Sequence, residues 1–388
     1  MDFKLEQKVK VIFSRELGNT IVEILKLEEY KKPMIAIDGF LVTTPPIKNI
    51  LEILKTNGFE YYIYDKIVSD PPTVVIDQGA ELFAKNQCDC VIGIGGGSSI
   101  DSARGINIVR TLGGKISDYA LGKEITELCK GLISVPTTSG TGSELSNALI
   151  VTDPDTHEKL AVLSNKAVSE YAILDPELTI TLPKNMTAAT GLDTFSHAAE
   201  GYTSRLSSPI TDAICEKIMY LIVKYLPSAV KNGDDIEARE RMMVAAALGG
   251  WMLNNAGTHI GHSQAHIIGS LYGIPHGMAC AYALPGTLMY TAQANSKKIK
   301  EIGLIMGAEF SKDLTDLEIG KITAERFKWF RDTVVVMEPL TKFNLSKEDI
   351  LSNAQKVVEE RFANNSPMEI NLDLAKKLLD IFGQEYSG

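Results

Sequence analysis

Short apolar runs and amphipathic stretches alternate along the first half of the chain. Five runs are predicted to be β-strands: Lys8–Phe13, Met34–Asp38, Glu60–Asp65, Cys90–Gly95 and Leu132–Pro136. Amphipathic stretches between them, such as Pro46–Thr56 and Thr73–Asn86, predict helices. Alternation of this kind predicts a doubly wound parallel sheet. The segment Asn147–Asp175 then predicts a β-ribbon with a polar turn at Asp153–Glu158.

The periodicity becomes helical after Leu182 and Pro183. Helices are predicted at Thr187–Thr203, Thr211–Leu226, Ile236–Asn254, Ser263–Tyr272 and Lys321–Thr333. No strand is predicted after Pro183. The fold class predicted is therefore α/β plus all-α, with an α/β domain over residues 1–183 and an all-helical domain over residues 184–388.

Composition agrees with two globular domains. The chain has 388 residues, of which 45% are hydrophobic and 23% charged, enough for a substantial core. A net charge of −10 disfavours nucleic acid and anionic membranes as partners. Residues 1–20 carry charges throughout and no apolar run is long enough to span a bilayer, so we expect neither a signal peptide nor a membrane segment. Five cysteines without a CxxC pair predict reduced core thiols in a cytoplasmic protein.

A glycine-rich turn joins the strand at Cys90–Gly95 to a predicted helix. Gly95, Gly96 and Gly97 let the backbone turn sharply and approach a ligand. Ser98 and Ser99 follow at the helix start, where free N–H groups and the positive end of the dipole favour phosphate. The turn lacks the GxGxxG fingerprint, so a turn that only tightens the crossover also fits.

Three further features suit a nucleotide. Asp38 ends an apolar run, where a carboxylate can accept hydrogen bonds from a ribose diol and repel a 2′-phosphate, which favours NAD over NADP. The loop Pro136–Glu144 carries several hydroxyls beside Gly140 and Gly142. Lys159 follows the polar turn and can reach a ribose or phosphate. Each also has a plainer interpretation: a turn aspartate, a surface loop and a solvated lysine.

Histidines and one carboxylate recur at helical spacing in the second half. Asp193 and His197 lie four residues apart, which puts both on one helical face. His262 and His266 repeat that spacing within the stretch Asn255–Pro285, which contains no acid and no lysine or arginine. His259 falls on roughly the same face and His276 lies ten residues beyond His266, in a PHG turn. One carboxylate with imidazoles suits iron or zinc and suits magnesium or calcium poorly. Spacing alone does not choose between His266 and His276 as a ligand.

Four motifs, in this order, resemble those of the iron-containing (group III) alcohol dehydrogenase family: GGGSSID, PTTSGTGSE, GLDTFSHAAEGY, and HxxxH followed by PHG. The resemblance runs from about Val11 to the C-terminal segment Pro367–Phe382, nearly the whole chain. It implies a Rossmann-like dinucleotide-binding domain followed by a helical metal-binding domain.

The resemblance also assigns roles to residues. It implies four metal ligands: Asp193, His197, His262 and His276. It places His266 beside the nicotinamide instead, as a candidate proton relay. The implied pyrophosphate contacts are Gly95, Gly96, Gly97, Ser98 and Asp101. The implied nucleoside contacts are Asp38, Thr137, Thr138 and Thr141, with Lys159 nearby. His259 is expected to be packed behind the site and His157 to be solvent-exposed.

Two positions depart from the family pattern. Ser263 stands where members often carry glycine, and Cys280 stands where they often carry asparagine. Neither is among the four implied ligands, so both bear on the substrate pocket.

The function expected is reversible hydride transfer between a primary alcohol, diol or hydroxy acid and NAD, with the aldehyde as product. Iron(II) is the expected metal, although the ligand set also accepts zinc, and a homodimer is expected from the family. Two alternatives stay open at this point. One is a zinc polyol dehydrogenase of the same architecture, whose relatives typically use fewer protein ligands. The other is a non-catalytic metal- or nucleotide-binding protein.

Overall fold

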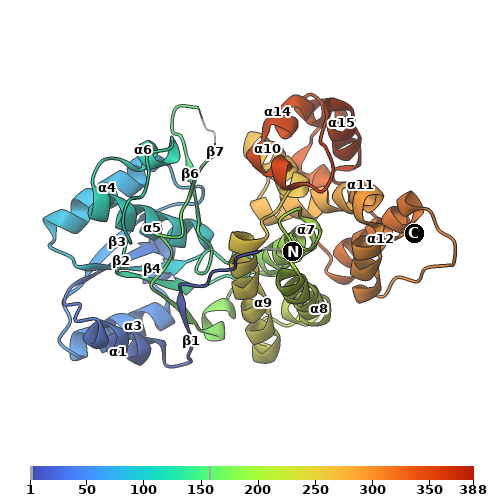
Figure 1. The fold of residues 1–388 in the computed structure, drawn as a ribbon. Coiled ribbons are helices and arrows are strands. Elements are labelled where there is room, and N and C mark those ends of the chain that lie inside the picture. Colours follow the sequence, from blue (N-terminus) through green and yellow to red (C-terminus); the bar gives the residue numbers. More distant parts are fainter. Residues whose placement is uncertain (1–2, 157–158) are drawn as a thin grey trace. The chain divides into compact units, whose positions relative to one another are not determined.

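The computed structural model describes residues 3–156 and 159–388. Its main sheet is parallel, with strand order β1-β8-β5-β4-β2-β3. Figure 1 labels β1, β2, β3 and β4 of this sheet. The strands are β1 (Lys10–Phe13), β2 (Pro33–Asp38), β3 (Tyr62–Ile67), β4 (Cys90–Gly95), β5 (Leu132–Pro136) and β8 (Tyr171–Leu174). All five strands predicted from apolar runs are present, and the doubly wound parallel sheet is confirmed.

Helices cover both faces of this sheet because its central strands are apolar on both sides. Ile35 and Ile37 of β2 pack in one core with residues of α1 and α3, whereas Met34 and Ala36 pack in a second core with residues of α4 and α5. This is the two-residue alternation of a strand. The helices are α1 (Leu17–Leu27), α2 (Gly39–Val42), α3 (Pro45–Thr56), α4 (Thr73–Lys85), α5 (Gly97–Leu112) and α6 (Ile116–Ala120).

The predicted ribbon is shorter than expected. Only β6 (Ala148–Thr152) and β7 (Lys159–Leu163) pair antiparallel, and β8 returns to the main sheet between β1 and β5. The reason is burial: all four residues of β8 are buried, whereas β6 alternates between buried and half-buried positions. A strand apolar on both faces suits the interior of a parallel sheet. His157 and Glu158, in the turn of the ribbon, lie outside the described residues.

The second half of the chain is helical, and in its described residues no strand follows Pro183, as predicted. The long helices are α7 (Lys184–Thr203), α8 (Pro209–Lys231), α9 (Ile236–Asn255), α10 (Ile260–Tyr272), α11 (His276–Ile305) and α12 (Asp316–Trp329). Shorter ones follow at α13 (Lys347–Leu351), α14 (Ala354–Glu359) and α15 (Leu372–Ile381). Their apolar faces form one continuous core.

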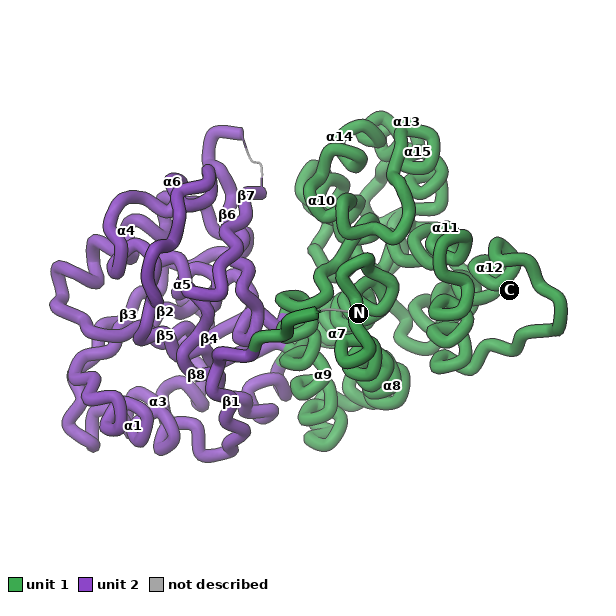
Figure 2. The backbone as a smooth tube through the Cα atoms, viewed as in Figure 1, with its two compact units in different colours: residues 1–6, 139–141, 182–388 green, residues 7–138, 142–181 purple. Residues whose placement is uncertain are grey.

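The chain folds into two compact units (Figure 2). One contains Gln7–Thr138 and Gly142–Thr181, and the other contains Leu182–Gly388 with the N-terminal residues up to Glu6. Ser139–Thr141 belongs to the helical unit, where Thr194 donates a hydrogen bond from Oγ1 to the carbonyl oxygen of Gly140 at 3.0 Å. No helix in the described ranges has the length and apolarity that a bilayer crossing requires. All five cysteines are free and buried, as expected of core thiols.

Candidate functional site

One face of α7 presents three buried polar side chains to the interior of the helical unit. Asp193 and His197 are four residues apart, and Glu200 lies three residues beyond His197, so all three share a face. Asp193 is 2% exposed, His197 4% and Glu200 1%. Side chains this polar are rarely so deeply buried without a partner that offsets the loss of water.

Three imidazoles surround one carboxylate oxygen. The Nε2 atoms of His197, His262 and His276 lie 3.6, 3.8 and 3.7 Å from Asp193 Oδ1. These separations are too long for hydrogen bonds. Within the described parts of the chain, neither Asp193 Oδ1 nor His262 Nε2 has a hydrogen-bond partner. Nitrogen and oxygen donors about 2.1 Å from one ion lie roughly 3.4–3.6 Å apart at angles of about 110–120°. The four predicted ligands therefore gather around one carboxylate oxygen, and three of them, Asp193, His262 and His276, belong to a group of donor atoms within 4.8 Å of one another.

Electrostatics keeps Asp193 and His197 in the forms that bind a cation. Burial lowers the pKa of His197 to about 4, so the ring is neutral and keeps a lone pair at neutral pH. Burial would raise the pKa of Asp193, but the neighbouring imidazoles and a hydrogen bond with Cys280 lower it. A carboxylate and a neutral imidazole are the forms that bind metal.

The PHG turn brings His276 to this cluster. His276 is the first residue of α11, and Gly277 follows it. A Cβ on Gly277 would lie 2.3 Å from the carbonyl oxygen of Ala189, in α7 one turn before Asp193. Only glycine permits so close an approach of α11 to α7, which is why His276 reaches Asp193.

Glu200 fixes the orientation of His262 from behind. Its Oε1 is 2.6 Å from His262 Nδ1, and its Oε2 accepts hydrogen bonds from the backbone N–H groups of His259 at 2.8 Å and Gly261 at 3.0 Å. Burial would raise the pKa of Glu200, but the His262 charge and hydrogen bond lower it to about 2. Burial would lower the pKa of His262, but the charge and hydrogen bond of Glu200 raise it. With Nδ1 held by Glu200, Nε2 is the ring nitrogen left to bind a metal once it gives up its proton.

His259 does not lie on the α10 face that its spacing predicts. It precedes α10 as the N-cap residue, with φ −140° and ψ −130°. Its Nε2 is 2.9 Å from Thr203 Oγ1, and its Nδ1 is 3.6 Å from Glu200 Oε2. The ring is fully buried, as a packed histidine behind the site would be.

His266 lies one turn beyond His262 and makes a different contact. Its Nδ1 is 3.3 Å from Glu360 Oε1, and its ring stacks on His276 with centroids 5.4 Å apart. Ser263, one of the two departures, donates a hydrogen bond to Glu360 Oε2 at 2.6 Å. Burial would raise the pKa of Glu360, but His266 lowers it through a hydrogen bond and its charge, with help from Ser263. Ser263 and His266 thus meet at one carboxylate.

Sequence reasoning missed three residues at this site. Glu200 carried a signal, because it lies seven residues after Asp193 on the same helical face. Cys280 was noted only as a departure, yet it belongs to the one group of metal-binding side chains found among the described residues: Asp193, His262, His276 and Cys280. Glu360 lies 94 residues after His266 and no local pattern indicated it.

Several of the predicted cofactor residues lie at one edge of the parallel sheet. β2, β4 and β5 are neighbours, so their carboxyl ends bring together Asp38, Gly95–Gly97 and Thr137, the residue after β5. The chain runs outward from β2 to β3 and from β4 to β5, which makes this edge a topological switch point.

The glycine-rich turn has the expected geometry. Gly95 has φ 148°, and a Cβ there would lie 2.3 Å from Ser99 Oγ, so only glycine fits. Gly96 is the N-cap of α5, and Gly97 and Ser98 begin that helix. The free N–H groups of the first turn suit a phosphate.

Residues around this turn make the following contacts within the protein. Asp38 accepts a hydrogen bond from Phe40 N at 2.8 Å and caps α2. Thr137 N donates to Gly95 O at 2.9 Å, and Thr138 lies against Gly96. Lys159 Nζ forms an ion pair with Asp70 Oδ1 at 3.0 Å. The backbone N–H of Asp70 donates a hydrogen bond to Ser98 Oγ at 3.3 Å.

Asp101 and Thr141 were also predicted to contact the cofactor, and their surroundings differ from those of the residues above. Asp101 is buried and accepts a hydrogen bond from Ile150 N at 3.0 Å, and burial raises its pKa to about 6. Its carboxylate therefore anchors β6 within the unit. Thr141 belongs to the segment grouped with the helical unit. The roles implied for both stay predictions.

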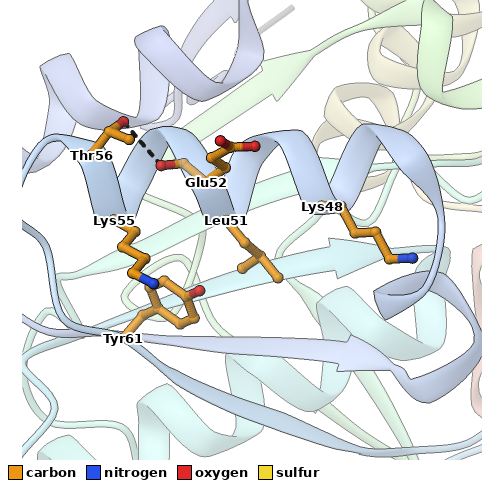
Figure 3. Close-up of a pocket in the computed structure, with 6 residues that line it drawn as sticks. All are labelled: Lys48, Leu51, Glu52, Lys55, Thr56 and Tyr61. Atoms are coloured by element: carbon orange, nitrogen blue, oxygen red, sulfur yellow. Dashed lines mark hydrogen bonds between the residues drawn. The ribbon is translucent and has the colours of Figure 1, made fainter.

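A surface hollow of about 580 Å³ lies on the α/β unit, apart from these residues. It is lined by Lys48, Leu51, Glu52, Lys55, Thr56 and Tyr61, all on α3 or just after it (Figure 3). None of the predicted site residues lines this hollow.

Comparison with known proteins decides the family. The profile described as iron-containing alcohol dehydrogenase matches residues 9–176, and the C-terminal profile of the Fe-containing alcohol dehydrogenase family matches residues 187–382. The chain belongs to the iron-containing alcohol dehydrogenase family.

Individual relatives agree with this assignment. The chain is 31% identical over 353 residues to an NAD-dependent methanol dehydrogenase of Bacillus methanolicus, and the alignment covers 91% of each protein. It is 30% identical over 370 residues to a 1,3-propanediol dehydrogenase of Citrobacter freundii, covering 95% of each. An alcohol dehydrogenase structure from Oenococcus oeni matches with a TM-score of 0.91 and 31% identity, over 98% of this chain and 100% of that one.

Family membership confirms the expected enzyme class. Members of the iron-containing alcohol dehydrogenase family are oxidoreductases, and the comparisons do not favour the two alternatives, a zinc polyol dehydrogenase and a non-catalytic binding protein. The fold, with its α/β part and helical part, is likewise that of the family.

Proposed function

We propose that this enzyme transfers hydride reversibly between a small primary alcohol and NAD, using iron(II) held by Asp193, His197, His262 and His276. The observation that carries the proposal is the group of three Nε2 atoms 3.6–3.8 Å from Asp193 Oδ1, an oxygen without a hydrogen-bond partner in the described residues. One carboxylate and three imidazoles suit iron(II) and also accept zinc. When bound, such an ion supplies Lewis-acid catalysis, which lowers the pKa of an alcohol and polarises a carbonyl.

The nucleotide half of the proposal rests on the sheet edge. The first turn of α5 would bind the pyrophosphate through its N–H groups, and Thr137 and Thr138 would contact the nucleoside. Asp38 would accept hydrogen bonds from the ribose diol and repel a 2′-phosphate, which selects NAD over NADP. Lys159 would contact the phosphates after giving up its ion pair with Asp70.

His266 would carry the alcohol proton between the substrate and solvent. Glu360 holds Nδ1 of this ring, which leaves Nε2 for the proton that moves. His266 is 16% exposed at its side chain, so it has contact with both the interior and water. We therefore assign proton transfer to His266 and metal binding to His197, His262 and His276.

The names of two relatives, a methanol dehydrogenase and a 1,3-propanediol dehydrogenase, support a small primary alcohol or diol as substrate. We also propose a cytoplasmic location, supported by five free thiols, and a homodimer, which the mass in light scattering tests.

A metal-dependent assay tests the function. The protein is stripped with a chelator, reloaded anaerobically with iron(II) or zinc, and mixed with NADH and a panel of short aldehydes. Oxidation of NADH should require the metal and should be lost on chelation. NADH oxidation that survives complete metal removal would refute the metal-dependent mechanism. Absence of turnover with every aldehyde and either metal would refute the substrate class.

A further inference from the structure

A fifth side chain with a metal-binding atom lies in the same cluster. Cys280 follows His276 by one helical turn on α11 and is 1% exposed. Its Sγ is 3.6 Å from His276 Nε2, and it approaches the Asp193 carboxylate closely enough to help lower its pKa. The donor atoms of Asp193, His262, His276 and Cys280 all lie within 4.8 Å of one another.

We propose that Cys280 is itself a metal ligand, as a thiolate, and joins the four proposed ligands as a fifth donor. This inference rests on the proposed metal site. Its first support is the distance to His276: sulfur about 2.3 Å and nitrogen about 2.0–2.1 Å from one ion are roughly 3.6 Å apart at a tetrahedral angle. The observed 3.6 Å agrees with that separation.

The second support is that the donor atoms of Asp193, His262, His276 and Cys280 lie close to one another. His276 and Cys280 share a helical face because they are four residues apart. Gly277 lets that face approach α7, so both donors lie near Asp193. On binding, a metal–sulfur bond forms, the S–H bond breaks, and the proton leaves to solvent; nothing is oxidised or reduced.

The thiolate would change which metal the site prefers. Thiolate is a soft ligand that selects zinc more strongly than a carboxylate and imidazoles alone do. The family pattern, with asparagine often at this position, offers no such ligand. The chain would thus hold zinc more tightly, relative to iron(II), than a site that lacks the sulfur.

Cobalt(II) provides a direct spectroscopic test, because sulfur-to-cobalt charge transfer absorbs in the near ultraviolet and oxygen or nitrogen ligands give no such band. Metal-free protein is titrated with cobalt(II) alone. Wild type should show the band, saturating at one equivalent. Cys280→Ser should lose the band and keep the weaker visible absorption of bound cobalt. Cys88→Ser, a buried thiol of the α/β unit, is the matched control and should retain the band.

Competition with a zinc chelator gives the second readout. Cys280→Ser should lower zinc affinity about tenfold or more and should lower iron(II) affinity less, while Cys88→Ser changes neither. Equal losses for both metals would contradict the selectivity argument.

The outcomes separate this inference from the proposed function. Cobalt that binds wild type without the charge-transfer band, or a band that persists in Cys280→Ser, overturns the thiolate ligand and leaves the function standing. Wild type that binds no cobalt overturns both. If Cys280→Ser does not fold, X-ray absorption of zinc-loaded wild type decides the question. A sulfur neighbour at about 2.3 Å supports the ligand, and a shell of nitrogen and oxygen alone refutes it.

Discussion

Replacing Glu200 with glutamine should weaken metal binding although Glu200 is not itself a proposed ligand. In wild type, Oε1 accepts the Nδ1 proton of His262, while Oε2 accepts hydrogen bonds from the backbone of His259 and Gly261. A glutamine has one oxygen and one NH₂ group. If the NH₂ faces the backbone, it opposes N–H donors. If it faces His262, Nδ1 must accept and Nε2 must carry the proton, so Nε2 no longer binds metal.

The size of the effect follows from these hydrogen bonds. Loss of a partner that orients a metal-binding histidine typically costs about 10- to 100-fold in metal affinity, or roughly 1.4–2.8 kcal/mol. The alternative orientation instead leaves backbone donors at the start of α10 unpaired, which costs about 1–3 kcal/mol of unfolding free energy for each buried unsatisfied group. Glu200→Gln should therefore lose metal affinity, stability, or part of both.

Competition with a chelator measures the metal affinity, and urea denaturation of the metal-free protein measures the stability. Glu144→Gln is the matched control, because Glu144 is also buried, at 2% exposed, but lies in the α/β unit. It should leave metal affinity unchanged. A folded Glu200→Gln protein whose metal affinity and stability both equal those of wild type would refute the role given to Glu200.

Four further outcomes are expected. His262→Ala should abolish turnover while NADH binding, measured by fluorescence titration, survives; a collapse of NADH affinity or activity near wild type would contradict the assignment. His266→Ala should keep its metal by elemental analysis and turn over more slowly with an altered pH profile, whereas His276→Ala should lose metal and activity together; the reverse pattern would exchange the two roles. Asp38→Gly should raise activity with NADP, and an unchanged cofactor preference would show that another residue reads the ribose. Burial raises the pKa of Glu144 from 4.5 to about 7, so the folded state binds its proton more tightly than the unfolded state and stability should rise as pH falls from 8 to 5. Glu144→Gln should remove roughly 3 kcal/mol of that pH dependence in urea denaturation, and equal slopes for both proteins would refute the cause given.

The sequence by itself determined the fold class and most of the secondary structure. Strands such as Cys90–Gly95 are apolar on both faces, and together with the alternating helical stretches this predicted buried parallel strands. The Asp193–His197 and His262–His266 spacings placed polar groups on single helical faces because helical periodicity is local. Motif resemblance then chose His276 over His266, a choice that spacing left open.

Only the tertiary structure decided the contacts between residues that lie far apart in the sequence. The apolar run Tyr171–Leu174 was assigned to the ribbon, because pairing between β1 and β5 depends on residues far away in the chain. Glu360 lies 94 residues from His266, and only packing of the helices brings its carboxylate within 3.3 Å of that ring. From the sequence, Cys280 was only a departure from the family pattern. The close approach of α11 to α7 at Gly277 places its sulfur among the possible metal-binding atoms. Hydrogen bonds and metal coordination act over a few ångströms, so they depend on which helices pack together and on how closely their backbones approach.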